Sequence, residues 1–70
     1  MKNLIKERLK ELRKENSLTQ KQIAKIINKS ETGYASWEQG LSEPCINDLL
    51  VLSEYYNVTV DYLIGKDEIW

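Results

Sequence analysis

The side chains best suited to chemistry lie in one short segment, Glu31–Gln39, and they share one face of a helix. At about 100° per residue, four short or neutral side chains fall together: Thr32, Ala35, Ser36 and Gln39. Tyr34 and Trp37 fall on the other side. The polar face carries no Lys and no Glu, although exposed helices are usually rich in both. Short hydrogen-bonding groups suit a helix that lies flat against the base edges of a DNA major groove.

Catalytic chemistry finds little support in the sequence. The chain of 70 residues contains no His and a single Cys, Cys45. His is the commonest general base and the commonest metal ligand. No activated nucleophile, glycine-rich phosphate loop or metal-ligating cluster stands out either, so we expect a protein that is not an enzyme and that needs neither metal nor cofactor. We interpret Cys45 as a weak N-cap or a packed thiol, because a lone cysteine forms no internal disulfide.

Two helices joined by a tight turn position the polar face. Thr19 and Gln22 have the spacing of a capping box at the start of a first helix. Ser30 is the N-cap candidate for the second, and Gly40 suits its C-terminal stop. Taken alone, this pattern is also compatible with two helices of a small bundle that have no binding role.

The rest of the chain supplies helices that hold this pair. Apolar spacing predicts a helix at about 4–15, another at about 46–56 and a short one at about 60–64. We therefore expect an all-α fold, a compact five-helix bundle without strands, with one domain over residues 1–65 and a tail at 66–70. The expected core consists of Ile5, Leu9, Leu12, Leu18, Ile23, Ala24, Ile27, Tyr34, Trp37, Ile46, Leu49, Leu52, Tyr56, Val58 and Leu63.

Charge is distributed unevenly along the chain. Residues 1–29 hold nine Lys or Arg against three Glu, whereas residues 30–70 hold one Lys against eight Asp or Glu. Such asymmetry predicts one basic face that meets phosphates, and the alternative is that folding mixes the two halves. The sequence has no apolar run long enough for a membrane span and no signal peptide. We expect a cytoplasmic protein without a membrane partner.

Five motifs occur in a specific order. They are Arg8–Arg13 (RLKELR), Leu18–Gln20 (LTQ), Ala24, Trp37–Gly40 (WEQG) and Asn57–Gly65 (NVTVDYLIG). Together they resemble the phage-repressor type of helix-turn-helix domain, the Cro and lambda-repressor superfamily also called Xre-like. The resemblance covers about residues 4–65, and its motifs are specific to the family rather than to one member.

The resemblance implies a sequence-specific regulator of transcription, a repressor rather than an activator, that binds double-stranded DNA. Its relatives bind as homodimers on a palindromic operator, and the helix at about Glu31–Gln39 enters the major groove while the preceding helix crosses the backbone. By resemblance the base contacts are Glu31, Thr32, Ala35 and Ser36. The phosphate contacts are Thr19, Gln20, Lys29 and Gln39. Arg13 and Glu38 match an ion pair, and the last helix with Ile69–Trp70 is the expected dimer contact.

Three positions depart from the family pattern. Glu31 stands where glutamine is common, so it accepts from cytosine N4 or serves only the helix dipole. Gly33 lies inside a helix, where we expect it to allow close approach to DNA or to the preceding helix. The loop after Gly40 has Leu41–Glu43 in place of Lys or Arg, which predicts few phosphate contacts and a shallow salt dependence. A rival function is a protein-binding module, such as an antitoxin, that uses the same fold.

Overall fold

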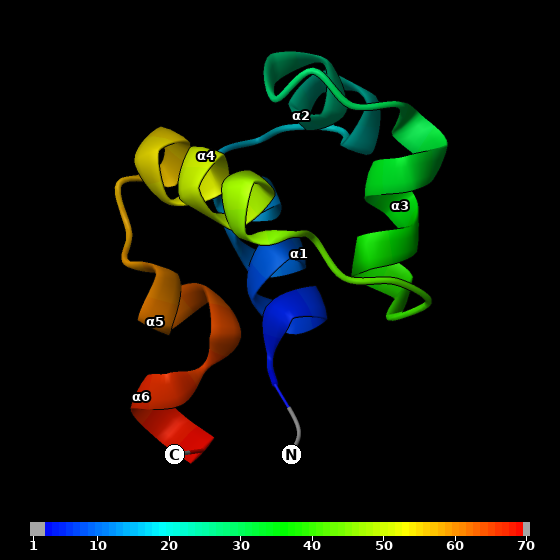
Figure 1. Ribbon diagram of the computed structural model, residues 1–70. Coiled ribbons are helices and arrows are strands. Elements are labelled where there is room, and N and C mark those ends of the chain that lie inside the picture. Colours follow the sequence, from blue (N-terminus) through cyan, green and yellow to red (C-terminus); the bar gives the residue numbers. More distant parts are fainter. Residues whose placement is uncertain (1–2, 70) are drawn as a thin grey trace.

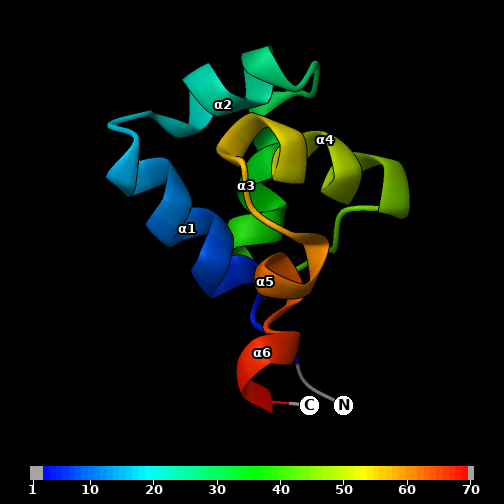
Figure 2. The same cartoon turned by 90° about the vertical axis from the view of Figure 1, so that its left-hand side faces the viewer.

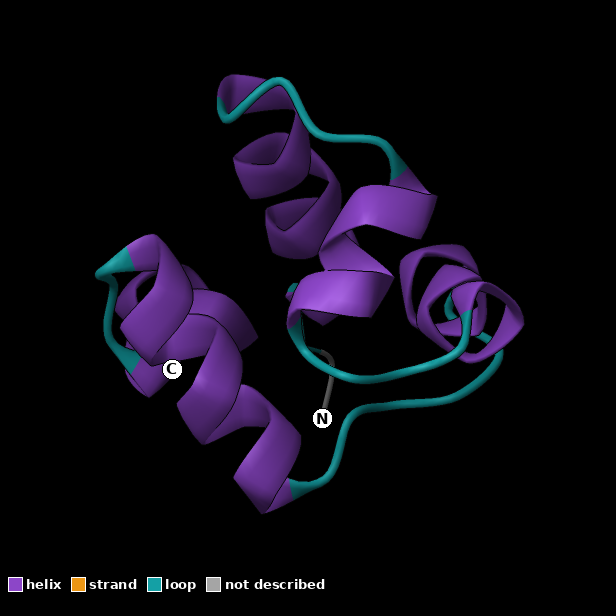
Figure 3. Ribbon diagram, turned by 90° about the horizontal axis from the view of Figure 1, so that it is seen from above, coloured by secondary structure: helices purple, strands orange, loops and turns teal. Residues whose placement is uncertain are grey.

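Helices account for nearly all of the regular structure. The computed structural model describes residues 3–69, and within that range it contains helices and loops but no strand (Figure 3). The helices are α1 (Ile5–Glu15), α2 (Gln20–Ile26), α3 (Glu31–Gln39), α4 (Ile46–Tyr56), α5 (Val60–Ile64) and α6 (Lys66–Ile69). The first five lie where the sequence predicts them, so the all-α helix-turn-helix fold is confirmed.

The sixth helix corrects the expectation of a plain tail after Gly65. Lys66–Ile69 forms one helical turn below α5, at the same end of the molecule as the start of α1 (Figures 1 and 2). Arg8 Nη2, on α1, lies 3.5 Å from Asp67 Oδ1. The Arg8 guanidinium also stacks over the ring of Tyr62, with its Cζ atom 4.1 Å from the ring centre. These contacts connect α6 and α5 to α1. The side chain of Ile69 and all of Trp70, the expected dimer contact, lie outside the described residues.

Local capping sets the start of each functional helix. Thr19 Oγ1 accepts from the Gln22 backbone N–H at 3.1 Å, and Gln22 Oε1 accepts from the Thr19 N–H at 2.8 Å. This reciprocal pair is the predicted capping box at α2. Ser30 Oγ accepts from the Gly33 N–H at 3.0 Å and caps α3. The entry angles of both helices are therefore fixed by residues adjacent to them in sequence.

Left-handed residues end the helices and allow the chain to turn. Gly40 (φ 79°) follows α3, Asn57 (φ 56°) follows α4 and Gly65 (φ 84°) follows α5. Two features exclude a side chain at Gly65. Its positive φ is unfavourable for any residue with a Cβ, and a Cβ there would stand 2.6 Å from Leu4 Cγ. The Leu4 N–H donates to the Ile64 carbonyl at 2.9 Å, so the chain entering α1 packs directly against the end of α5.

The core lies between α1 and the helices around it. α1 contacts α3 on one side and α5 on the other, and α2 packs on α3 (Figures 1 and 2). The buried apolar side chains are Ile5, Leu9, Leu12, Ile23, Ala24, Ile27, Tyr34, Trp37, Leu49, Leu52 and Leu63. All of them were expected in the core. Leu18, Tyr56 and Val58 are partly buried and pack against the same cluster.

Ile46 is the one core prediction that is wrong, since its side chain is 69% exposed. Ile46 is the first residue of α4, immediately after the N-cap residue Cys45. Helical spacing from Leu49 and Leu52 suggested that it faces inward. The buried residue at this end of α4 is instead Pro44, just before the helix. Among residues 3–69, no helix is long and apolar enough to cross a bilayer.

Candidate nucleic-acid interface

One face of α3 is anchored in the core, which leaves the opposite face available. Tyr34 is fully buried and Trp37 is nearly so, and their rings pack edge to face with centres 5.7 Å apart. Aromatic pairs of this geometry are stabilised beyond the area that they bury. The inward side of α3 is therefore rigidly held, and the outward side carries Glu31, Thr32 and Gln39, which are all exposed.

A buried ion pair connects α3 to α1. Arg13 Nε donates to Glu38 Oε2 at 2.7 Å, and Arg13 Nη2 donates to Glu38 Oε1 at 3.1 Å. The Glu38 side chain is only 1% exposed. Arg13 Nη1 also donates to the Leu18 carbonyl at 3.0 Å, so the same guanidinium holds the segment before α2. Such a bidentate pair fixes orientation as well as distance, because the guanidinium fork matches a carboxylate in one plane.

The electrostatics of this pair favour its charged form. Burial alone would raise the pKa of Glu38, but the hydrogen bonds from Arg13 and Gln20 and the charge of Arg13 hold that pKa below its usual value. The hydrogen bond to Glu38 raises the pKa of Arg13 despite burial. Both groups are therefore ionised at neutral pH. A buried ion pair of this kind is costly to break from one side.

Gln20 joins the same network from the first residue of α2. Its Nε2 atom donates to Glu38 Oε1 at 3.1 Å, which leaves the second hydrogen of that amide for another acceptor. Gln20 is half-buried and Thr19 beside it is exposed. The structure thus brings the predicted phosphate residues at the start of α2 next to the predicted ion pair. No local pattern of residues indicates the contact between Gln20 and Glu38.

The predicted base-contacting residues differ in how freely they are presented. Glu31 and Thr32 are exposed at the start of α3, while Ala35 and Ser36 are half-buried further along. Ser36 Oγ donates to the Gly33 carbonyl at 2.7 Å and also contacts the Ser42 hydroxyl. The hydroxyl of Ser36 is therefore shared with the loop that follows α3, and only its remaining lone pair is available for a base.

Gly33 has a structural explanation that the sequence did not suggest. A Cβ at this position would stand 2.9 Å from Ser30 Oγ, the atom that caps α3. Real Cβ atoms rarely approach a neighbour so closely. The absence of a side chain leaves room for the cap.

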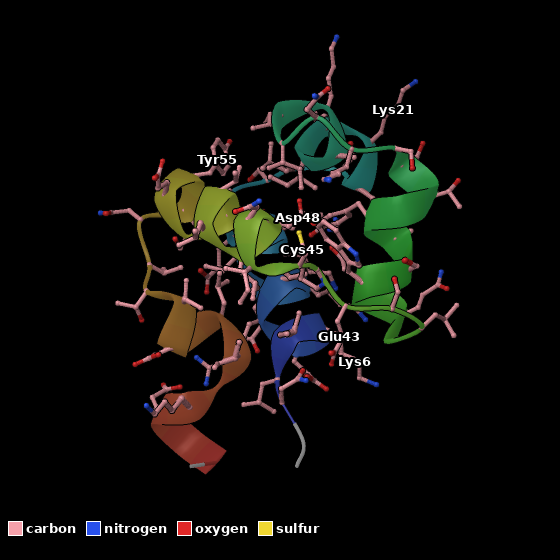
Figure 4. The ribbon with its side chains drawn as sticks, in the orientation of Figure 1. Lys6, Lys21, Glu43, Cys45, Asp48 and Tyr55 are labelled. Carbon is pink, nitrogen blue, oxygen red and sulfur yellow. The ribbon has the colours of Figure 1, made fainter. Side chains whose placement is uncertain are left out.

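Lys29 is paired with a carboxylate of α4, although its side chain is still 41% exposed. Its Nζ atom lies 3.0 Å from Asp48 Oδ1, so it connects the turn between α2 and α3 to the start of α4. Asp48 Oδ2 accepts from the Cys45 N–H at 3.3 Å and from the Cys45 thiol at 3.2 Å, and Figure 4 shows Asp48 and Cys45 side by side. Lys29, Asp48 and Cys45 thus form one chain of contacts. Burial opposes ionisation of Asp48, but its contacts with Lys29 and Cys45 lower its pKa. Cys45 is exposed at the N-cap of α4 rather than packed in the core.

Comparison with known proteins identifies the family to which this chain belongs. A family model described as helix-turn-helix matches residues 9–63, and the chain therefore belongs to that family. The match includes α2, the turn and α3, together with the ion-paired residues Arg13 and Glu38. The resemblance to phage repressors is confirmed by the relatives described next.

Two curated relatives and one solved structure illustrate the similarity. The chain is 42% identical over 62 residues to the HTH-type transcriptional regulator ImmR of Bacillus subtilis, covering 89% of this chain and 49% of ImmR. It is 36% identical over 62 residues to the cryptic phage CTXphi transcriptional repressor RstR of Vibrio cholerae, covering 89% of this chain and 55% of RstR. A crystal structure of a transcriptional regulator from Listeria innocua superposes with a TM-score of 0.89 at 31% identity, covering all of this chain and 66% of that one. The chain spans about half the length of the curated relatives it matches.

Proposed function

We propose that this chain is a DNA-binding module that regulates transcription by inserting α3 into the major groove of double-stranded DNA. The observation that carries the proposal is the pairing of two faces on α3. One face is locked to α1 and α2 by the buried contacts among Arg13, Glu38 and Gln20. The other face is exposed, short-chained and polar, which lets the helix backbone approach base edges closely.

The base contacts follow from the exposed end of α3. Glu31 accepts a hydrogen bond from cytosine N4, and Thr32 offers a hydroxyl or a methyl group. Ala35 packs against a thymine methyl, and Ser36 accepts through the lone pair that its internal contacts leave. The phosphate contacts are assigned to Thr19, the second amide hydrogen of Gln20, Gln39, and Lys29 when it leaves Asp48.

The proposed assembly is a homodimer on a palindromic operator, because a two-fold axis repeats α3 in two half-sites about one helical turn apart. Its contact is assigned to α5 and the segment after it. Repression then follows from occupancy, since a dimer on an operator excludes other proteins from the same DNA. The proposed role in repression is supported by relatives named as a transcriptional regulator and as a phage transcriptional repressor. A protein with this role would act in the cytoplasm.

A protein-binding role is the second candidate function, and one surface favours it. The outer side of α4 exposes four large apolar side chains: Ile46, Leu50, Val51 and Tyr55. An exposed apolar cluster often marks a protein contact. A partner that covers α4 would act as a regulator of the module, or would be the target of an antitoxin built on this fold.

Selection of bound sequences from random duplex DNA at low salt tests the proposed function. The expected result is enrichment of one palindrome. Thr32→Ala should weaken the base preference at one position in each half-site. Ser53→Ala is a matched control, since the Ser53 hydroxyl donates to the Leu50 carbonyl within α4 and its variant should select the same palindrome as the unaltered protein. Failure to bind any duplex at low salt would refute the proposal and favour the protein-binding role.

A further inference from the structure

The C-terminal end of α3 has no cation of its own. The sequence contains neither Lys nor Arg between Lys29 and Lys66, and the loop that follows Gly40 carries Leu41, Ser42 and Glu43. DNA phosphates flank a helix that lies in the major groove, and affinity for them comes largely from Lys and Arg. If lysines met DNA phosphates only at the N-terminal end of α3, the helix would be attached to the DNA at that end alone.

A lysine from another helix occupies this place. Gly40 adopts φ 79°, and a Cβ there would stand 3.1 Å from Lys6 Cδ and 3.6 Å from Lys6 Nζ. The side chain of Lys6, an exposed residue in the first turn of α1, therefore lies across Gly40. Figure 4 shows Lys6 beside the C-terminal end of α3 and Lys21 of α2 beyond the opposite end. The two ammonium groups bracket α3.

The side of α1 that faces α3 carries further lysines beside Lys6. Lys6, Lys10 and Lys14 recur every four residues and line a cleft that also contains Gln39 of α3. None of these lysines lines the neighbouring cleft, where α1 meets Tyr62 and Asp67. Glu7 and Glu11 border both clefts. The lysines of α1 are thus directed to the α3 side of the molecule, where the DNA backbone is expected.

An acidic residue stands next to Lys6. Glu43 lines the same cleft as Lys6 and Gly40, and its Oε2 atom accepts from Asn3 Nδ2 at 2.6 Å. Figure 4 shows the Glu43 and Lys6 side chains close together below the start of α4. A carboxylate at this place repels a phosphate that approaches Lys6, because two like charges a few ångströms apart still interact at moderate salt.

We propose that Lys6 binds the DNA phosphate at the C-terminal end of α3, in place of a basic loop after the helix, and that Glu43 weakens this contact. This inference rests on the proposed DNA-binding function. It assigns the phosphate contact at the C-terminal end of α3 to a residue of α1, and it makes Glu43, in the loop after Gly40, a single acidic residue that limits affinity for DNA. Lys6 has a competing structural role, since a cation near the C-terminus of α3 also stabilises the helix dipole.

The experiment measures fluorescence anisotropy of a duplex obtained by the selection above, titrated with protein over a series of salt concentrations. For Lys6→Gln the expected result is binding about fivefold to tenfold weaker near 0.1 M salt, with a salt slope reduced by about 0.9 for each protomer. For Glu43→Gln the expected result is binding about threefold tighter. Glu54→Gln, which alters an exposed carboxylate on α4, is the matched control for Glu43→Gln and should bind as the unaltered protein does.

Thermal unfolding of each variant separates the two roles of Lys6. A reduced melting temperature for Lys6→Gln with an unchanged salt slope would assign Lys6 to the helix dipole and overturn the inference. Equal affinity of Lys6→Gln and the unaltered protein would overturn it as well. If the unaltered protein itself binds no duplex at low salt, the proposed DNA-binding function fails first, and that result is distinct from the other two.

Discussion

Glu38 Oε1 accepts hydrogen bonds from Arg13 Nη2 and from Gln20 Nε2, each at 3.1 Å, so one carboxylate oxygen connects three helices. Arg13 belongs to α1, Gln20 begins α2 and Glu38 is near the end of α3. The relative placement of the two helices in the helix-turn-helix thus depends on a single buried acidic group. This contact holds the polar face of α3 at a fixed angle to the start of α2.

Glu38→Ala should lower the free energy of unfolding by about 3–5 kcal/mol, because it leaves the Arg13 guanidinium largely buried without its partner. Chemical denaturation monitored through Trp37 fluorescence measures the change. Glu54→Ala, which removes an exposed carboxylate from α4, should change stability by less than about 0.5 kcal/mol. A loss below 1 kcal/mol for Glu38→Ala would show that the pair contributes little.

Stability should fall in acid partly through Glu38. The pKa of Glu38 is lower in the folded protein than its ordinary value of 4.5, so its charged form stabilises the fold above that value. The contribution is lost as the pH falls through the lower, folded pKa. The stability difference between the unaltered protein and Glu38→Gln should therefore be constant from pH 6 to 8 and should narrow progressively below about pH 4.5. A difference that does not depend on pH would contradict the assigned shift.

Gly33 and Ser30 should show strong non-additivity. Ser30→Ala removes the α3 cap and should cost about 1 kcal/mol. Gly33→Ala gains about 0.5–1 kcal/mol of helix propensity but displaces the Ser30 hydroxyl, so alone it should be nearly neutral. When Ser30 is already alanine, the same Gly33→Ala change should be stabilising by that full amount. A double-mutant cycle of unfolding free energies measures the coupling, and strict additivity would mean that the cap does not require the glycine.

Asp48 should compete with DNA for Lys29. The Lys29 ammonium group lies 3.0 Å from Asp48 Oδ1, so a phosphate must displace this carboxylate. Asp48→Asn removes the competing charge, and it should increase DNA affinity by about twofold to threefold at low salt. Adding Lys29→Gln to the same variant should abolish the gain. If Asp48→Asn tightens binding in the absence of Lys29 too, the effect belongs to overall charge rather than to this pair.

Local signals made most of the fold predictable from sequence. Thr19, Ser30 and Gly40 act on backbone groups within a few residues of themselves, so the bounds of α2 and α3 could be inferred without tertiary information. Residues at helical spacing identified the buried side chains correctly except for Ile46. There, the periodicity of α4 extends one turn beyond the part of the helix that packs on the core, and pattern alone does not show where packing ends.

Contacts between distant residues were harder to predict. Arg13 and Glu38 are 25 residues apart, and only the family resemblance suggested that they meet. Lys29 is a predicted phosphate contact, and no local rule shows that Asp48 of α4 folds next to it. The helical turn after Gly65 was missed because a left-handed glycine ordinarily ends a helix and gives no sign that another begins immediately.

Substitution of Glu31 by glutamine tests most directly whether α3 reads bases. Glutamate accepts from cytosine N4, whereas glutamine forms a bidentate contact with adenine. Selection with Glu31→Gln should therefore change the preferred base pair at one position in each half-site, from cytosine toward adenine, and leave the other positions unaltered. If Glu31→Gln, Thr32→Ala and the unaltered protein all select the same sequence with the same ranking of bases, α3 does not read the major groove and the account is wrong.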